Sequence, residues 1–282
     1  MLGPLAGLLV VSRPSTFREW AWLGVSVAWL ATWLAPSGDV VEQLLRAAGV
    51  LVAGAFVAVS LGWRAPLFRR AIAALGLATL ALGLWCAALR LDWHELKTAL
   101  ARDVARSFEE MATQVDAAGG GDTSRLLRQM ADNASKWATL TPALLFLDAL
   151  AGVLLGWLLY HRIATRPLGE APAPFATFRF SDQTVWLPVA GLALALVPGP
   201  AALHDVGSNL LLVAVALYAA RGLAVVGAGA GRLPRVTTAF VTVVALFLLP
   251  FVVGGLTLLG LADTWLDFRR RPASPATGGF DR

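Results

Sequence analysis

Long apolar runs alternate with short polar loops along the whole chain, and seven of these runs approach the 20 or so residues that cross a bilayer. The predicted spans are residues 20–36, 44–62, 70–89, 138–160, 184–200, 206–229 and 235–262. We therefore expect an all-α protein, a polytopic membrane helix bundle of about seven transmembrane helices, with six and eight as the alternative counts.

The one long polar stretch, residues 90–136, lies between the third and fourth predicted spans. Asp92 and Glu95 have capping-box spacing, and apolar residues then recur every three or four positions, which predicts an amphipathic helix. AGGGDT at 118–123 ends this helix, and a second one leads into the next span. We expect an extracytoplasmic amphipathic helical hairpin that serves as a lid or docking surface, or a solvated connector.

This pattern divides the chain into four parts: N-terminal membrane helices over 1–89, the hairpin over 90–136, C-terminal membrane helices over 137–265 and a charged flexible tail over 266–282. The first residues, MLGPLAGLLVVSRP, have an apolar run without a preceding cationic region. We expect this segment to be retained and to lie at the membrane interface; removal as a signal peptide is the alternative.

Arginines occupy alternate loops and predict the orientation of the bundle. They precede the first span and follow the second, fourth and sixth: Arg13, Arg18, Arg64, Arg69, Arg70, Arg162, Arg166, Arg179, Arg232 and Arg235. The loops at 36–43 and 200–206 contain no Lys or Arg. The positive-inside rule then predicts a multi-pass protein of the bacterial inner (cytoplasmic) membrane with a cytoplasmic N-terminus.

The last apolar run leaves the side of the tail open. An unbroken helix over 235–262 puts the tail outside, although the arginines at 269–271 favour the cytoplasm. A break at Pro250, Gly254 and Gly255 would return the chain as two half-helices and bring the tail inside. Both alternatives remain open from the sequence.

Composition agrees with a membrane protein. The chain is 57% hydrophobic and 15% charged, with a mean hydropathy of +0.68, far from the values of a soluble domain. The net charge of +5 comes from loop arginines that orient helices, so we expect the lipid bilayer as a partner and no nucleic acid. The single cysteine, Cys86, excludes an intrachain disulfide.

Enzyme and cofactor motifs find no support in the sequence. GAGAG at 227–231 is not a dinucleotide fingerprint, and the chain has no phosphate-binding loop. His94, His161 and His204 are too far apart in sequence for metal-site spacing. We expect no cofactor, no metal and no catalytic residue, so ATP-driven work would need another subunit.

Asp148 lies inside the fourth predicted span, about 9 Å beyond the helix start at Pro142. A carboxylate costs roughly 3 kcal/mol at a helix centre, which its apolar neighbours outweigh. We expect Asp148 to face the bundle interior and to bind a ligand; a carboxylate bonded between helices, or a protonated one, is the alternative. Gly152 and Gly156 have GxxxG spacing and predict close helix packing.

The outer end of the sixth span carries His204, Asp205 and Asn209, at a depth close to that of Asp148. These four residues are our candidate ligand-binding pocket, which requires the fourth and sixth helices to be neighbours. Asn209 alone can instead cap its helix or bond a neighbouring one.

Tyr218 and Arg221 lie further along the sixth span, with Arg221 about 22 Å from its outer end. Arg221 there snorkels to the cytoplasmic interface, or forms an interior polar, ligand-binding spot with Tyr218. The connection at 171–188, APAPFATFRFSDQTVWLP, has aromatics around Arg179 and predicts an interfacial elbow.

The order of these features resembles the YybS-like family of predicted bacterial multi-helix membrane proteins, over roughly residues 65–271. LRLDWHELKTALARDVARSFEEM, TPALLFLDALAGVLLGWLLYHRI, NLLLVAVALYAARGLAVV and GLADTWLDFRRR carry the resemblance, which is strongest over 209–222 and 260–269. Arg221 stands where family members commonly have glutamine, and the N-terminal membrane region is shorter. The family has no established biochemical function.

The resemblance implies an architecture similar to the substrate-binding components of energy-coupling factor transporters, which capture vitamins or metals and rely on separate ATPases. Ala31 and Ala35 are the nearest equivalent of the small residues through which those components dock.

Two hypotheses follow from the sequence. The first is a solute-binding or transport component, with ATPase and coupling subunits as partners. The second is a non-enzymatic scaffold or docking subunit of an envelope assembly, with the 90–136 hairpin as its docking surface for envelope proteins. Candidate polar residues that converge on one cavity would favour the first hypothesis.

Overall fold

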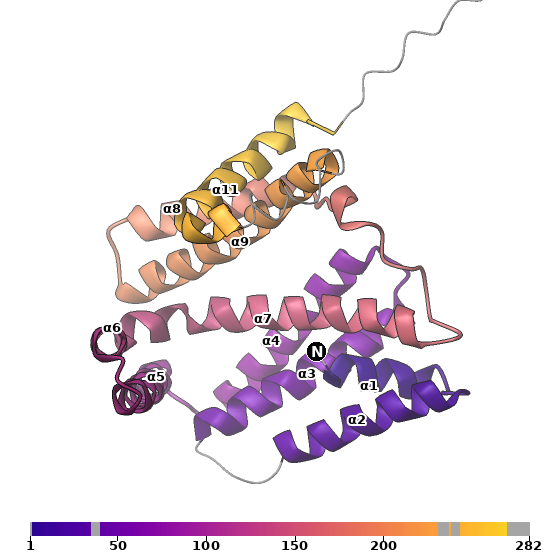
Figure 1. The fold of residues 1–282 in the computed structure, drawn as a ribbon, viewed down its shortest axis with the longest axis horizontal. Coiled ribbons are helices and arrows are strands. Elements are labelled where there is room, and N and C mark those ends of the chain that lie inside the picture. Colours follow the sequence, from indigo (N-terminus) through magenta and orange to yellow (C-terminus); the bar gives the residue numbers. More distant parts are fainter. Residues whose placement is uncertain (1, 35–39, 231–236, 238–242, 270–282) are drawn as a thin grey trace, which may run out of the picture. The chain divides into compact units, whose positions relative to one another are not determined.

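A computed structural model describes residues 2–34, 40–230, 237 and 243–269, and throughout this part of the chain the regular structure is helical (Figure 1). This confirms the all-α fold class. The helices are α1 (Leu2–Val11), α2 (Phe17–Trp33), α3 (Val40–Gly62), α4 (Leu67–Ala88), α5 (Trp93–Ala117), α6 (Gly121–Asp132), α7 (Ala134–Ile163), η1 (Phe175–Thr177), η2 (Asp182–Val185), α8 (Trp186–Leu196), α9 (Ala201–Ala230) and α11 (Leu249–Leu266).

Five of the described helices, α3, α4, α7, α9 and α11, are long and apolar enough to cross a membrane. Two predicted spans coincide with shorter helices: α2 has 17 residues and α8 has 11. The α8 helix ends at Leu196 because Pro198 and Pro200 follow it and cannot continue a helical hydrogen-bond ladder.

The chain divides into two compact units, and the first comprises Met1–Pro172 and Pro198–Asn209. Within it, α1 packs against α2, α3 and α7, and Leu5, Leu8 and Leu9 are fully buried. The segment is therefore packed into the first unit, and its expected position at the membrane interface stays a prediction. Gly7 allows the close approach of α1 to α3, because a Cβ there would lie 2.8 Å from Cγ2 of Val57.

Helices α5 and α6 pack against each other across a tight turn in which Gly119 has a φ of +85°. The Ser124 hydroxyl donates to Oδ1 of Asp116 at 2.8 Å, and Arg128 pairs with the same carboxylate. Leu100 of α5 packs with Val41 and Ala138. These apolar contacts hold α5 against the ends of α3 and α7.

The second unit comprises Ala173–Val197 and Leu210–Arg282, and its central feature is the parallel pair α9 and α11. Thr257 donates to the Val215 carbonyl at 3.3 Å, and Arg221 bonds Asp263; both pairs are 42 residues apart. Contacts at a constant separation mean that the two helices run in the same direction. Part of the predicted run at 235–262 lies outside the described residues, so whether it is one helix or a broken one stays a prediction.

By this register, Ala230 at the end of α9 and Leu249 at the start of α11 lie about 35 Å apart along the helix axes. Leu249 begins α11, with Pro250 in its first turn, where proline is favoured. The helix then continues through Gly254 and Gly255, which do not interrupt it. The C-terminal ends of α9 and α11 consequently point to the same side.

Candidate functional site

Asn209 near the start of α9 is bonded to the backbone of α7 within the first unit. Its Oδ1 accepts the Ala143 N–H at 2.8 Å, and its Nδ2 donates to the Thr139 carbonyl at 2.7 Å. The same Nδ2 also donates to the Asp205 carbonyl at 2.7 Å. This part of α9 and α7 are thus direct neighbours, as the predicted pocket required.

These bonds lie beside Pro142, which is inside α7 and has no N–H to donate. A regular α-helix pairs the N–H of residue 143 with the carbonyl of residue 139. Asn209 offers one acceptor and one donor to these same two groups, as a primary amide can. We call this arrangement the Asn209 junction.

Lys97 of α5 reaches the same end of α9, where its Nζ lies 2.6 Å from Oδ2 of Asp205. Both side chains are partly exposed, at 27% and 19%. The ion pair joins the polar connector between α4 and α7 to the start of α9, one turn from Asn209. Of the predicted pocket residues, Asp205 and Asn209 are therefore brought together, and His204 beside them is half-buried.

Asp148 lies elsewhere on α7 and is exposed. The buried stripe of this helix runs through Leu150, Val153, Trp157 and Tyr160. Residues two and five positions from Asp148 project from the opposite side of a helix with 3.6 residues per turn. Within the first unit Asp148 therefore lies opposite the buried stripe, and the expectation that it faces the interior of the whole bundle stays a prediction. Of the two packing glycines, Gly156 is buried and Gly152 half-buried.

In the second unit, Arg221 of α9 is 3% exposed and bonded to Asp263 of α11. Its Nε donates to Oδ2 of Asp263 at 2.9 Å, and its Nη2 donates to the Asp263 carbonyl at 3.1 Å. Arg269 donates to the same Oδ2 at 2.7 Å. Two guanidinium groups therefore share one buried carboxylate, and the expected snorkelling of Arg221 is wrong.

The same network fastens the elbow between α7 and α8. Nη1 of Arg269 donates to the carbonyls of Ala176 and Phe178, at 3.0 and 2.9 Å. The Arg221 guanidinium lies 5.3 Å from the centre of the Phe180 ring, a cation–π contact. Phe180 also meets Tyr218 edge to face, with ring centres 5.2 Å apart.

Some polar atoms of this Arg221 network lack a hydrogen bond from any described residue. They are Nη1 of Arg221, Oδ1 of Asp263 and Nε of Arg269. Nη1 of Arg221 lies 3.6 Å from Oδ1 of Asp182, an ion pair without a hydrogen bond. The network thus keeps both donors and acceptors available at a buried position.

Sequence reasoning missed Lys97, Asp263 and Arg269 as members of these sites. One signal was present: the two segments with the strongest family resemblance, 209–222 and 260–269, turn out to contact each other through Arg221, Asp263 and Arg269. Of the two proposed docking residues, Ala31 is exposed on α2 and Ala35 lies outside the described residues.

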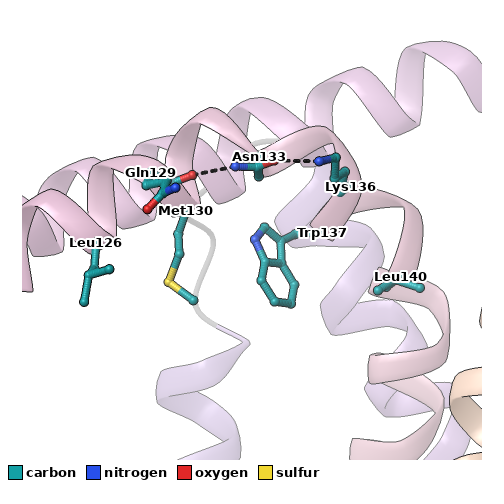
Figure 2. Close-up of a pocket in the computed structure, with 7 residues that line it drawn as sticks. All are labelled: Leu126, Gln129, Met130, Asn133, Lys136, Trp137 and Leu140. Carbon is teal, nitrogen blue, oxygen red and sulfur yellow. Dashed lines mark hydrogen bonds between the residues drawn. The ribbon is translucent and has the colours of Figure 1, made fainter.

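An apolar groove of about 560 Å³ lies where α6 meets α7. Figure 2 shows Met130 and Trp137 pointing to the same side of the ribbon, below the hydrogen bonds that link Asn133 to its neighbours. The lining residues are Leu126, Gln129, Met130, Asn133, Lys136, Trp137 and Leu140. Leu126 is 61% exposed, so part of this apolar surface is uncovered within the chain.

Comparison with known proteins gives one family. A model described as "Predicted membrane protein (DUF2232)" matches residues 1–264. No curated protein and no solved structure matches the chain. The match covers both units and agrees with the apolar membrane-length helices found in the structure. The chain belongs to the DUF2232 family of predicted membrane proteins.

Proposed function

We propose that this membrane protein is a solute-binding component of a transport assembly in the bacterial inner membrane, driven by separate energising subunits. The proposed binding site is the outer end of α7 and α9, with His204 and Asp205 facing the solute, Asn209 holding the α7 backbone beside them and α5 as the lid. The observation that carries the proposal is the Lys97–Asp205 ion pair, which ties this lid to the site.

The Lys97 and Asp205 side chains are both partly exposed, and an ion pair of this kind opens more readily than a buried one. Exposed and half-exposed pairs contribute little stability, typically about 0–1 kcal/mol. A solute that carries one charged group can therefore compete for Asp205 or for Lys97 at little cost and open this ion pair. The pair offers one carboxylate and one ammonium group, so the proposed solute is small, polar and charged.

The Asn209 junction supports the same reading. Transporter ligand sites are commonly formed at interrupted membrane helices, where backbone groups are held by side chains or by the ligand itself. Here Pro142 removes one hydrogen bond from the α7 ladder, and Asn209, one turn along α9 from Asp205, holds the backbone groups beside it. A binding site at this point would need small movements of one helix end only.

The proposed orientation follows the positive-inside rule, with the N-terminus in the cytoplasm and α5 and α6 outside, among about seven spans. The parallel α9 and α11 then end on the cytoplasmic side, together with the basic residues after Leu266. The likeness of the sequence to YybS-like proteins and to substrate-binding components of energy-coupling factor transporters supports the assignment by fold analogy.

Native mass spectrometry of the full-length protein, extracted in mild detergent from its own membrane, tests this proposal. The expected result is a small-molecule adduct on the unaltered protein that Asp205→Asn reduces at least tenfold. Asp103→Asn is the matched control, because Asp103 forms an exposed ion pair with Arg106 on α5, the helix that carries Lys97. An unaltered protein without any adduct, or equal loss in both variants, would contradict the proposal.

One observation favours a second function, a docking subunit of an envelope assembly. Leu126 and Met130 of α6 and Trp137 in the first turn of α7 are exposed in the groove at the α6–α7 junction. Exposed apolar patches on a polar connector often mark contact with another protein or with lipid. In that case, charged substitutions in the groove, such as Met130→Glu, would release partners that Asp205→Asn leaves bound.

A further inference from the structure

Arg70, in the first turn of α4, is a buried cation without an ion-pair partner among the described residues. Its side chain packs on the Trp157 ring, with Cζ 4.3 Å from the ring centre, and the residue is 6% exposed. Nε of Arg70 has no hydrogen-bond acceptor in the described chain. The acid that faces it, Glu170, lies on the surface and does not close an ion pair.

Two further buried nitrogens adjoin Arg70 and likewise lack partners in the part that the structure describes. Nε1 of Trp157 is one, on a fully buried side chain, and Nε2 of His161 is the other. The rings of Trp157 and His161 lie 4.7 Å apart, so the three groups form one cluster. The Leu168 N–H donates to the Tyr160 hydroxyl at 2.9 Å and holds the following loop over the cluster.

The surrounding charge is positive. Arg69, Arg162 and Arg166 lie exposed at the same end of the first unit, and Arg18 donates to the Ile163 carbonyl at 2.7 Å. No acidic residue occupies the first turn of α4, and no side chain caps it. The positive end of that helix dipole therefore adds to the charges of Arg69 and Arg70, an arrangement that favours the binding of an anion.

A buried guanidinium that closes no ion pair is costly, and unpaired buried donors add to that cost. An anion that accepts hydrogen bonds from Arg70 and Trp157 would relieve both costs. Phosphate suits this site, because its several oxygens can accept from the guanidinium, the indole and the imidazole together. We propose that Arg70, Trp157 and His161 bind a phosphate group, either of an anionic lipid headgroup or of a free phosphorylated solute or ion.

The test uses the full-length protein in phosphatidylcholine nanodiscs and measures its thermal unfolding midpoint. One arm adds phosphatidylglycerol to the bilayer, and the other adds inorganic phosphate to the buffer. The expected result is a rise of the midpoint in one arm, which identifies the source of the phosphate. Arg70→Gln should weaken the apparent affinity about tenfold, the loss expected for one charge-assisted hydrogen bond.

Arg69→Gln is the matched control, because it removes the same charge one residue away from an exposed side chain. It should change the affinity by less than about twofold, because a solvent-exposed charge contributes little to binding. Trp157→Phe keeps an aromatic ring but removes the N–H, so it should also weaken binding. This variant provides the test if Arg70→Gln does not fold. No midpoint rise in either arm, or equal losses in Arg69→Gln and Arg70→Gln, would overturn the proposal.

Discussion

Gly222 of α9 and Gly260 of α11 lie where the two parallel helices meet through their backbones. A Cβ on Gly260 would lie 2.0 Å from the Tyr218 carbonyl oxygen, and one on Gly222 would lie 2.0 Å from the Leu256 carbonyl oxygen. No side chain fits at either position. This crossing brings Arg221 and Asp263 within hydrogen-bond distance, so the glycine pair and the ion network depend on each other.

Gly260→Ala should therefore force α9 and α11 apart. Overpacking at a close contact typically costs about 1–3 kcal/mol, and here the obstacle is backbone that cannot rotate away. We expect a clear fall of the thermal unfolding midpoint in detergent. Gly254→Ala on the same helix is the control, since nothing lies within 4 Å of its added methyl group. Equal midpoints for the two variants would contradict the crossing.

Asp263→Asn should be more destabilising than Arg221→Met. The Asp263 carboxylate neutralises both Arg221 and Arg269, whereas Arg221→Met leaves it paired with Arg269. Removing one partner of a buried ion pair costs about 3–5 kcal/mol, because the other charge remains buried. Unfolding of both variants by titration with a denaturing detergent measures which of them loses more stability. The reverse order, or no effect of Asp263→Asn, would show that the carboxylate does not hold the network.

Asn209→Ala should loosen α7 locally at Pro142. The substitution leaves the Thr139 carbonyl and the Ala143 N–H without their side-chain partner, at a cost of about 1–3 kcal/mol. Hydrogen exchange at the Ala143 amide should accelerate by roughly one to two orders of magnitude. Ser208→Ala, at the adjacent position, serves as the control. Unchanged exchange at Ala143 in Asn209→Ala would exclude the junction.

Glu19 provides a pH test at the start of α2. Its carboxylate accepts the N–H groups of Thr165, Ser15 and Thr16, at 2.7, 2.8 and 2.9 Å. These backbone donors, Thr165 first, hold the pKa of Glu19 far below its ordinary value of 4.5. The stabilisation is therefore complete above that ordinary value and is lost as the pH falls below it.

The unaltered protein should accordingly unfold at a higher temperature than Glu19→Gln at pH 7, with a difference that shrinks below about pH 4.5. Thermal unfolding of both proteins between pH 3 and pH 7 measures the difference. A gap between the two midpoints that stays constant throughout this range would rule out the ionised carboxylate as its source.

Hydropathy predicted the long helices well, because a membrane span needs a minimum apolar length that the sequence carries directly. The predicted runs at 44–62 and 70–89, for example, became α3 and α4 with shifts of a few residues. The face of a helix was harder to predict. The α7 helix is apolar around most of its circumference, so its sequence has little periodicity to show that Asp148 lies opposite the buried stripe.

Ion pairs between residues far apart along the chain could not be predicted from the sequence, for a different reason. Lys97 and Asp205 are 108 residues apart, and Arg221 and Asp263 are 42 apart. Each pair depends on which helices are neighbours and in which direction they run, and neither property follows from the pattern of one helix. The parallel direction of α9 and α11 decides that Arg221 meets Asp263.

Affinity purification of the tagged protein from its native membrane in mild detergent, followed by mass spectrometry of the proteins that accompany it, tests the proposed function most directly. A solute-binding component should recover ATPase subunits together with a transmembrane coupling protein. Recovery of envelope-synthesis or division proteins without ATPases would contradict this account and favour the docking function instead.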